Sequence, residues 1–225
     1  MSLQSTPHGL HAGDRFARPS AAAFMGWFLA LALLVWSFSG SELSAEKLVR
    51  GLPYMGNILS RMFPPDLARL DSILASLATT FQMAVSGCVL GLILSFPLAV
   101  LAAEGLSPHP AIRALTRGLI ALFRTVPDLI WALFFVIAVG LGPAAGVLAL
   151  MIDTIGYAGR FFAEAMEQTD KGPREALSTI GAHRTGLIFS AVVPNAMPSF
   201  IATSLFCVEK ATRASVVLGL VGAGG

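Results

Sequence analysis

Five long runs of mostly apolar residues, separated by polar stretches, dominate the pattern along this chain. They span residues 20–39, 76–103, 118–139, 144–165 and 198–221. A helix needs about 20 mostly apolar residues to cross a bilayer, and it satisfies its own backbone hydrogen bonds there. The pattern therefore predicts five transmembrane helices, with a tight turn at "GLGP" (140–143) between the third and fourth.

Composition supports an all-α, polytopic transmembrane bundle. The 225 residues are 55% hydrophobic and only 12% charged, with a mean hydropathy of +0.74. A soluble domain carries about 25% charged residues. The net charge of +2 is too small to indicate a nucleic-acid partner. Cys88 and Cys207 both lie in apolar runs, which is typical of small buried side chains rather than of a disulfide or a metal site.

The distribution of Lys and Arg predicts the orientation. With the N-terminus in the cytoplasm, eight of these side chains lie inside and four lie outside, in agreement with the positive-inside rule. We therefore expect a cytoplasmic tail at 1–19 and one transmembrane domain at 20–225, with an outer loop at 40–72. The inside set is Arg15, Arg18, Arg113, Arg117, Arg160, Lys171, Arg174 and Arg184, and the outside set is Lys47, Arg50, Arg61 and Arg69.

The outer loop contains a regular apolar stripe. Apolar side chains recur at steps of three and four and end at "FPPD" (63–66), which predicts a short amphipathic helix. The helix either lies on the membrane surface or packs on its neighbours. The stripe consists of Leu48, Leu52, Met55, Leu59 and Met62.

A polar insert at 167–187 separates the fourth and fifth apolar runs. Gly172 and Pro173 break the preceding helix, and Pro173 suits the first turn of a new one. Glu175 then lies near the positive N-terminal end of this short helix, and Gly181 ends or bends it. Pro194 and Pro198, further on, are expected to restart the membrane helix. The residues alone are equally compatible with an ordinary loop between helices.

The same segment resembles the docking loop of ABC importer permeases. That signature begins with Glu-Ala, here Glu175-Ala176, has a Gly six residues after the Glu, here Gly181, and reaches Pro194 beyond an apolar segment. Leu177 replaces the second Ala of the family. The resemblance implies a coupling helix that seats in a cleft of an ATP-hydrolysing subunit.

Three further stretches look like the phosphonate permease family. They are "FPPD" (63–66), "FVIAVGLGPAAGVLAL" (135–150) and "VVLGLVGAGG" (216–225). The resemblance implies a type I importer permease fold in the bacterial inner membrane, two copies forming the pathway, two ATPase subunits and a periplasmic phosphonate-binding protein. It places ATP and Mg²⁺ on the ATPase and no cofactor in this chain. The family continues past "GAGG" with a final helix, so a chain ending at Gly225 either is truncated or lacks that helix.

Ionisable residues within the predicted spans are candidates for the translocation pathway, because charges are costly in a bilayer. Arg124 and Asp128 are four residues apart around Pro127, so on one helix they would share a face and pair. Asp153 is either a buried hydrogen-bonded acid or a substrate contact.

The last predicted span carries three charges. Glu209 and Arg213 should share a face, with Lys210 pointing about 100° away. We expect Arg213 to assist an anionic substrate while Glu209 holds it in place. An internal ion pair that only locks the helix is the alternative.

Two other functions are alternatives to an importer permease for phosphonate. An ion-coupled carrier could use Asp153 or Glu209, but such carriers often show two related halves, and no such repeat is evident. An ABC permease for a different small substrate is a second alternative. The sequence contains no Gly-x-x-x-x-Gly-Lys-Ser/Thr motif and neither His-Glu-x-x-His nor Gly-x-Ser-x-Gly, so we expect no catalytic site in this chain.

Overall fold

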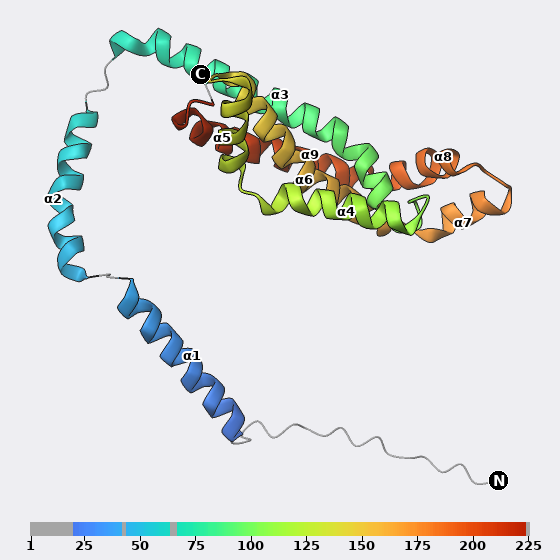
Figure 1. The fold of residues 1–225 in the computed structure, drawn as a ribbon, viewed down its shortest axis with the longest axis horizontal. Helices are drawn as coiled ribbons and strands as arrows, with labels where there is room; N and C mark the ends of the chain where they lie inside the picture. Colours follow the sequence, from blue (N-terminus) through green and yellow to red (C-terminus); the bar gives the residue numbers. More distant parts are fainter. Residues whose placement is uncertain (1–19, 42–43, 64–66, 224–225) are drawn as a thin grey trace. The chain divides into compact units, whose positions relative to one another are not determined.

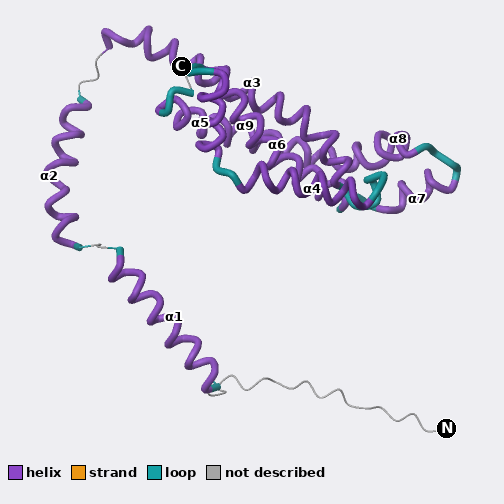
Figure 2. The backbone as a smooth tube through the Cα atoms, viewed as in Figure 1, coloured by secondary structure: helices purple, strands orange, loops and turns teal. Residues whose placement is uncertain are grey.

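The computed structural model describes residues 20–41, 44–63 and 67–223, and they are helical almost throughout (Figures 1 and 2). No strand occurs in these three ranges. The chain divides into two compact units, Met1–Pro65 and Asp66–Gly225, and each is described by itself. The predicted tail at 1–19 lies outside the described residues.

The first unit contains two helices. α1 (Ala21–Gly40) begins where the Ser20 hydroxyl accepts a hydrogen bond from Ala23 N–H at 3.2 Å, and its side chains are exposed throughout. α2 (Ala45–Met62) begins in the same way at Ser44 and coincides with the apolar stripe of the predicted outer loop. The helix in the outer loop is therefore confirmed, and its position on a membrane surface stays a prediction.

The second unit holds the remaining elements. They are η1 (Leu67–Arg69), α3 (Leu70–Ala102), α4 (Pro110–Thr125), α5 (Asp128–Val139), α6 (Pro143–Glu167), α7 (Lys171–Thr179), α8 (Arg184–Leu187), η2 (Ile188–Val192) and α9 (Val193–Leu220).

The core of this unit lies between α3, α6 and α9, with α4 and α5 against α6 (Figure 1). Small residues bring α3 and α6 into close contact. A Cβ placed on Gly91 would lie 2.5 Å from the Cβ of Thr154, and one on Gly87 would lie 2.8 Å from the Cβ of Leu150. In a membrane, the hydrophobic effect does not drive helices together, so their association depends on close van der Waals packing. Small residues allow that packing because they let the two backbones approach each other.

The prediction of one continuous helix at 118–139 is wrong, because two helices, α4 and α5, occupy this part of the chain. α4 and α5 meet at a break of 91° at Val126 and Pro127. Val126 is extended, as a residue before proline prefers, and Pro127 cannot donate to the preceding turn. The break fits against α6 because Gly156 has no side chain there: a Cβ on it would lie 2.9 Å from the backbone nitrogen of Arg124.

The predicted restart of the last helix at Pro194 and Pro198 is also wrong. Helix runs without interruption from Arg184 to Leu220, through the π-helical turn η2 and past both prolines. In η2 the Val193 N–H donates to Ile188 O, five residues back. This wider turn accommodates Pro194, whose ring would clash with the carbonyl of an ordinary preceding turn.

Within the three described ranges, four helical stretches are long and apolar enough to span a membrane: α1, α3, α6 and the stretch from Arg184 to Leu220. The bent α4–α5 pair makes a fifth if it is counted as one span. The predicted "GLGP" turn is confirmed, since Gly140 and Gly142 both have positive φ and Gly142 N–H donates to Gly222 O at 2.9 Å. The all-α transmembrane architecture is therefore confirmed.

Candidate functional site

The predicted docking loop is a short helix with well-defined ends. α7 starts at Lys171 because the carboxylate of Asp170 accepts a hydrogen bond from Gly172 N–H at 3.0 Å. Pro173 is its third residue, within the first turn as predicted. Glu175 lies in the second turn, so its expected position at the helix start is wrong. Asp170 occupies that position instead, and the sequence interpretation did not identify it.

Gly181 ends the docking helix through a Schellman motif. Its φ is +75°, its N–H donates to Ser178 O, and Ala182 N–H donates to Leu177 O, each at 3.1 Å. Glycine adopts this left-handed conformation at little cost. A Cβ on Gly181 would meet nothing within 4 Å, so this end of the helix faces open space in the described chain.

The docking helix presents its signature residues outward. Glu175, Ala176 and Gly181 are exposed, and Ile180 beside them is 76% exposed, whereas Leu177 is half-buried toward the protein. α7 packs on α8 and η2. Pro194, the last residue of the signature, lies in the first turn of α9 after the π-helical turn. The signature therefore forms an exposed helix end joined by a short turn to the continuous helix from Arg184 to Leu220.

Inside the bundle, one acid and one base form an ion pair between α6 and α9. Lys210 Nζ donates to both carboxylate oxygens of Asp153 at 2.7 Å. The two side chains are 33% and 16% exposed, respectively. Charges this close stabilise each other strongly once water is largely excluded. Lys210 thus points away from Glu209 and Arg213, as its place in the helix predicts.

A tyrosine joins this pair to α4. Lys210 Nζ lies 5.2 Å from the centre of the Tyr157 ring, and the Arg124 guanidinium carbon lies 5.9 Å from the same centre. Both distances are within the range of cation–π attraction. Tyr157 also stacks on Phe206 of α9 at 5.1 Å. The sequence interpretation missed Tyr157, because nothing in its local sequence marks it.

The predicted pairing of Arg124 with Asp128 is wrong. The break at Pro127 puts the two residues on different helices, and no ion pair joins them in the described part of the chain. Asp128 accepts instead from Leu129 N–H at 2.9 Å, at the start of α5. The sequence distance of four residues implied a shared face only for an unbroken helix.

Glu209 and Arg213 form an ion pair on the outer side of α9. Arg213 Nη2 lies 3.2 Å from Glu209 Oε1, and the Arg213 side chain is 68% exposed and that of Glu209 59% exposed. The predicted shared face is therefore present. Whether this pair contacts a substrate stays a prediction.

A cleft of about 580 Å³ lies between α4 and α6 and is rich in arginine. Arg117 pairs with Glu167, and Arg160 pairs with Glu164 at 2.7 Å. Arg124 lines the cleft while its guanidinium lies over Tyr157. The cleft therefore shares Arg124 with the cluster of Arg124, Tyr157, Lys210 and Asp153, which we call the membrane charge cluster.

Comparison with known proteins gives one family match and several similar relatives. Residues 95–225 match the family model described as "Binding-protein-dependent transport system inner membrane component". A Stutzerimonas stutzeri protein named as the permease of a phosphite transport system is 40% identical over 195 residues, covering 87% of this chain and 69% of that protein.

Two further similarities concern a second relative in sequence and a solved structure with a similar fold. The phosphate-import permease protein PhnE of Mycolicibacterium smegmatis is 45% identical over 178 residues, covering 79% of this chain and 34% of that protein. The chain therefore spans from about a third to about two thirds of the length of these relatives. A solved chain of the MetNI methionine ABC transporter, in an inward-facing conformation, is similar with a TM-score of 0.64, 20% identity, and coverage of 71% of this chain and 79% of that one.

Proposed function

Since the chain belongs to the family of binding-protein-dependent transport system inner membrane components, we propose that it forms the translocation pathway of an ATP-driven importer for phosphonate or a related phosphorus oxyanion. The observation that carries this proposal is the exposed end of α7, with Glu175, Ala176 and Gly181 facing outward. An exposed, well-capped helix end joined to a continuous 37-residue helix suits a socket in a second protein.

In this proposal, energy comes from partner subunits. Two ATPase subunits bind ATP and Mg²⁺ and receive α7 on the cytoplasmic face, while two copies of this chain form the pathway. The N-terminus also lies in the cytoplasm, and a periplasmic protein delivers the substrate. ATP binding closes the ATPase pair, and α7 passes that movement to α6 and to the helix from Arg184 to Leu220, which flank it in the chain.

The phosphorus oxyanion is supported by the relatives' names and by the cations inside the bundle. The relatives named above are assigned to phosphite and phosphate transport. Lys210 and Arg124 converge on Tyr157, and Arg213 lies on the exposed side of α9. An anion that leaves water loses its hydration, and nearby cations offset part of that cost.

An ion-coupled carrier remains the competing proposal, but the acids it would need are already paired. Asp153 lies against Lys210, and Glu209 lies against Arg213. A carrier would need one of these carboxylates to be available to its coupling ion. The importer proposal requires no such site, since ATP supplies the energy.

The test is reconstitution of the complete transporter. The chain is co-expressed with its ATPase subunits, purified by a tag on the permease and placed in liposomes with the binding protein and ATP. We expect the ATPase to co-purify and radiolabelled phosphonate, phosphite or phosphate to accumulate only with ATP. Uptake driven by a proton gradient without any ATPase subunit would establish the carrier instead.

A further inference from the structure

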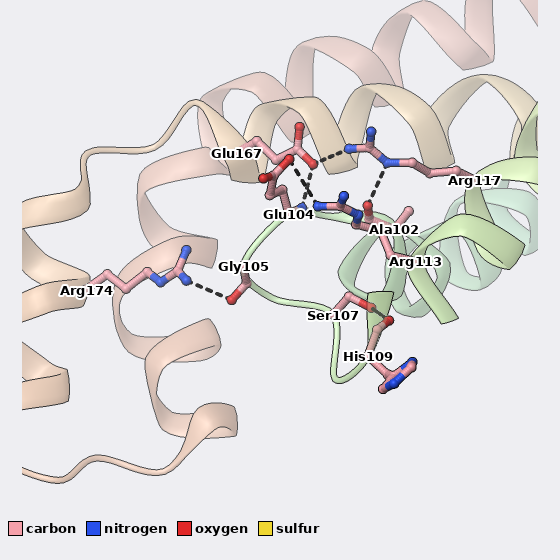
Figure 3. A network of polar contacts seen from close by, with 9 residues as sticks. All are labelled: Ala102, Glu104, Gly105, Ser107, His109, Arg113, Arg117, Glu167 and Arg174. Carbon is pink, nitrogen blue, oxygen red and sulfur yellow. Dashed lines mark hydrogen bonds and ion pairs between the residues drawn. The ribbon is translucent and has the colours of Figure 1, made fainter. Parts of the chain in front are cut away.

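The connection between α3 and α4, residues 103–109, is held by two arginines from the docking loop. Arg174 of α7 donates through Nη2 to Gly105 O at 2.7 Å (Figure 3). Arg184, the first residue of α8, donates through Nη2 to Ser107 O. In the sequence, Arg174 precedes Gly181 and Arg184 follows it. We call these two contacts the arginine clasp.

The far end of α6 is tied to the same connection. Glu167, the last residue of α6, accepts from Glu104 N–H at 2.6 Å and pairs with Arg117 of α4 (Figure 3). Arg117 also donates through Nε to Ala102 O at 2.9 Å. The end of α3, the middle of α4 and the end of α6 therefore share one set of charge-assisted hydrogen bonds, which are stronger than neutral ones.

The backbone of the connection is shaped for the clasp. Gly105 has φ +73°, a conformation that side chains with a Cβ rarely adopt. A Cβ on Gly105 would lie 2.6 Å from Nη2 of Arg174. Ala103 and Leu106 on either side are buried. The connection is therefore seated in the protein, with its Gly105 carbonyl presented to the docking helix.

We infer that the arginine clasp transmits movement of the docking helix to α3 and α4, and that Arg174 and Arg184 are positioning residues for coupling. This inference rests on the proposed function, in which α7 contacts the ATPase. The chain itself links α7 to α6 and to α8, and α7 packs on α8 and η2. The clasp adds a lateral link to the α3–α4 connection, so that helices on both sides of the core receive the same displacement.

The experiment measures substrate imported per ATP hydrolysed in the reconstituted complex. Arg174→Gln removes the donor, Arg174→Lys keeps a charge, and Gly105→Ala disturbs the same contact from the opposite side without altering the α7 surface. We expect Arg174→Gln and Gly105→Ala each to lower the ratio about fivefold, a change within the usual range of coupling between sites. For Arg174→Lys, the ratio of substrate imported to ATP hydrolysed should lie between that of these variants and that of the wild type.

Two comparisons isolate the clasp. Arg50→Gln removes a positive charge from an exposed ion pair with Glu46 on α2, outside both the docking loop and the 103–109 connection, and it should leave the ratio unchanged. The double variant Arg174→Gln/Gly105→Ala should be no worse than either single variant, because both remove one shared contact. ATPase co-purification is measured for every variant.

The result that would contradict the clasp differs from the result that would contradict the proposed function. If the wild type imports with ATP and Arg174→Gln keeps the wild-type ratio, the clasp does not transmit movement and the proposed function stands. Additive losses in the double variant, or loss of ATPase binding by Arg174→Gln with a normal ratio in Gly105→Ala, also overturn the clasp. A wild-type complex that shows no ATP-dependent import contradicts the proposed function itself.

Discussion

Tyr157 gathers two positive charges that lie far apart in the sequence. Arg124 comes from the end of α4 and Lys210 from the middle of α9, and both lie within 6 Å of the ring centre. Asp153, one helical turn before Tyr157 on α6, neutralises only Lys210. The membrane charge cluster therefore holds two cations and one acid, an excess of one positive charge.

The Asp153–Lys210 pair allows a stability prediction. Asp153→Asn leaves Lys210 without its acid and should lower the unfolding free energy by about 2 kcal/mol, below the cost for a fully buried pair because Lys210 is one-third exposed. The double variant Asp153→Asn/Lys210→Gln should recover most of that loss. Thermal unfolding in detergent measures both.

A matched control for this prediction is Glu164→Gln. It breaks the more exposed Arg160–Glu164 pair on the same helix, which should cost less than about 1 kcal/mol. A loss for Asp153→Asn no larger than that for Glu164→Gln would show that the pair in the bundle contributes no special stability.

Among the elements, the prolines show what the sequence could predict and what it could not. Apolar length located α1, α3, α6 and α9, because crossing a bilayer fixes the number of apolar residues. It did not distinguish Pro127, which ends a helix, from Pro97, Pro194 and Pro198, which lie inside helices. The break at Pro127 depends on Gly156, which lies on another helix, and the continuous helix past Pro194 depends on the π-helical geometry of η2, which apolar length does not predict.

In the docking loop, the sequence predicted individual positions within the helix as well as the helix itself. Pro173 and Gly181 act through local backbone geometry, so their positions in the first turn and at the helix end followed from residue type. The contacts of Arg174 and Glu167 did not follow, because their partners lie on the distant α3–α4 connection. Only the folded chain brings those segments together.

The end of α7 gives a prediction about coupling. Gly181→Val forces a β-branched residue into φ +75°, where the left-handed conformation costs about 1–2 kcal/mol, although a Cβ at this position would meet none of the residues that the structure describes. The helix end should therefore change shape, and ATP hydrolysis should continue with reduced uptake. Uptake and ATP hydrolysis are measured together in liposomes.

Gly186→Ala is the matched control, since Gly186 lies in α8 of the same loop, has an ordinary backbone conformation and also has open space around its Cβ position. It should transport normally. Full coupled transport by Gly181→Val would refute the role assigned to the glycine.

At the scale of the whole molecule, the charges on the spanning helices differ in how they are paired and how far they are exposed. Near the docking loop, the two arginines of the clasp donate to backbone carbonyls, and Arg117 pairs with Glu167. Arg213 is different, because it is 68% exposed on α9 and pairs only with its neighbour one turn away among the described contacts. A charge so placed on a spanning helix needs a water-filled or protein-lined surrounding.

Substitution of Arg213 separates the two interpretations of this pair. If Arg213 assists the anion, Arg213→Gln should reduce ATP-dependent uptake about tenfold, since a hydrogen bond to a charged group contributes about 1.5–3 kcal/mol. The double variant Glu209→Gln/Arg213→Gln should then stay as slow. Uptake is measured in complexes that retain their ATPase subunits.

The alternative predicts a different result for the double variant. If the pair only locks α9, removing both charges should restore uptake, because no charge is left without a partner. Undiminished uptake by Arg213→Gln alone contradicts the pathway role outright.

The π-helical turn at Ile188–Val192 sets the rotational phase between the two ends of the last helix. Such a turn takes in about one residue more than an α-helical turn, which rotates everything beyond it by about 100°. With this phase, Lys210 meets Asp153 while Arg184 reaches Ser107 O. Deleting a single residue here would turn one of these side chains away from its partner. The number of residues in this segment, more than their identity, therefore allows both contacts to form at once.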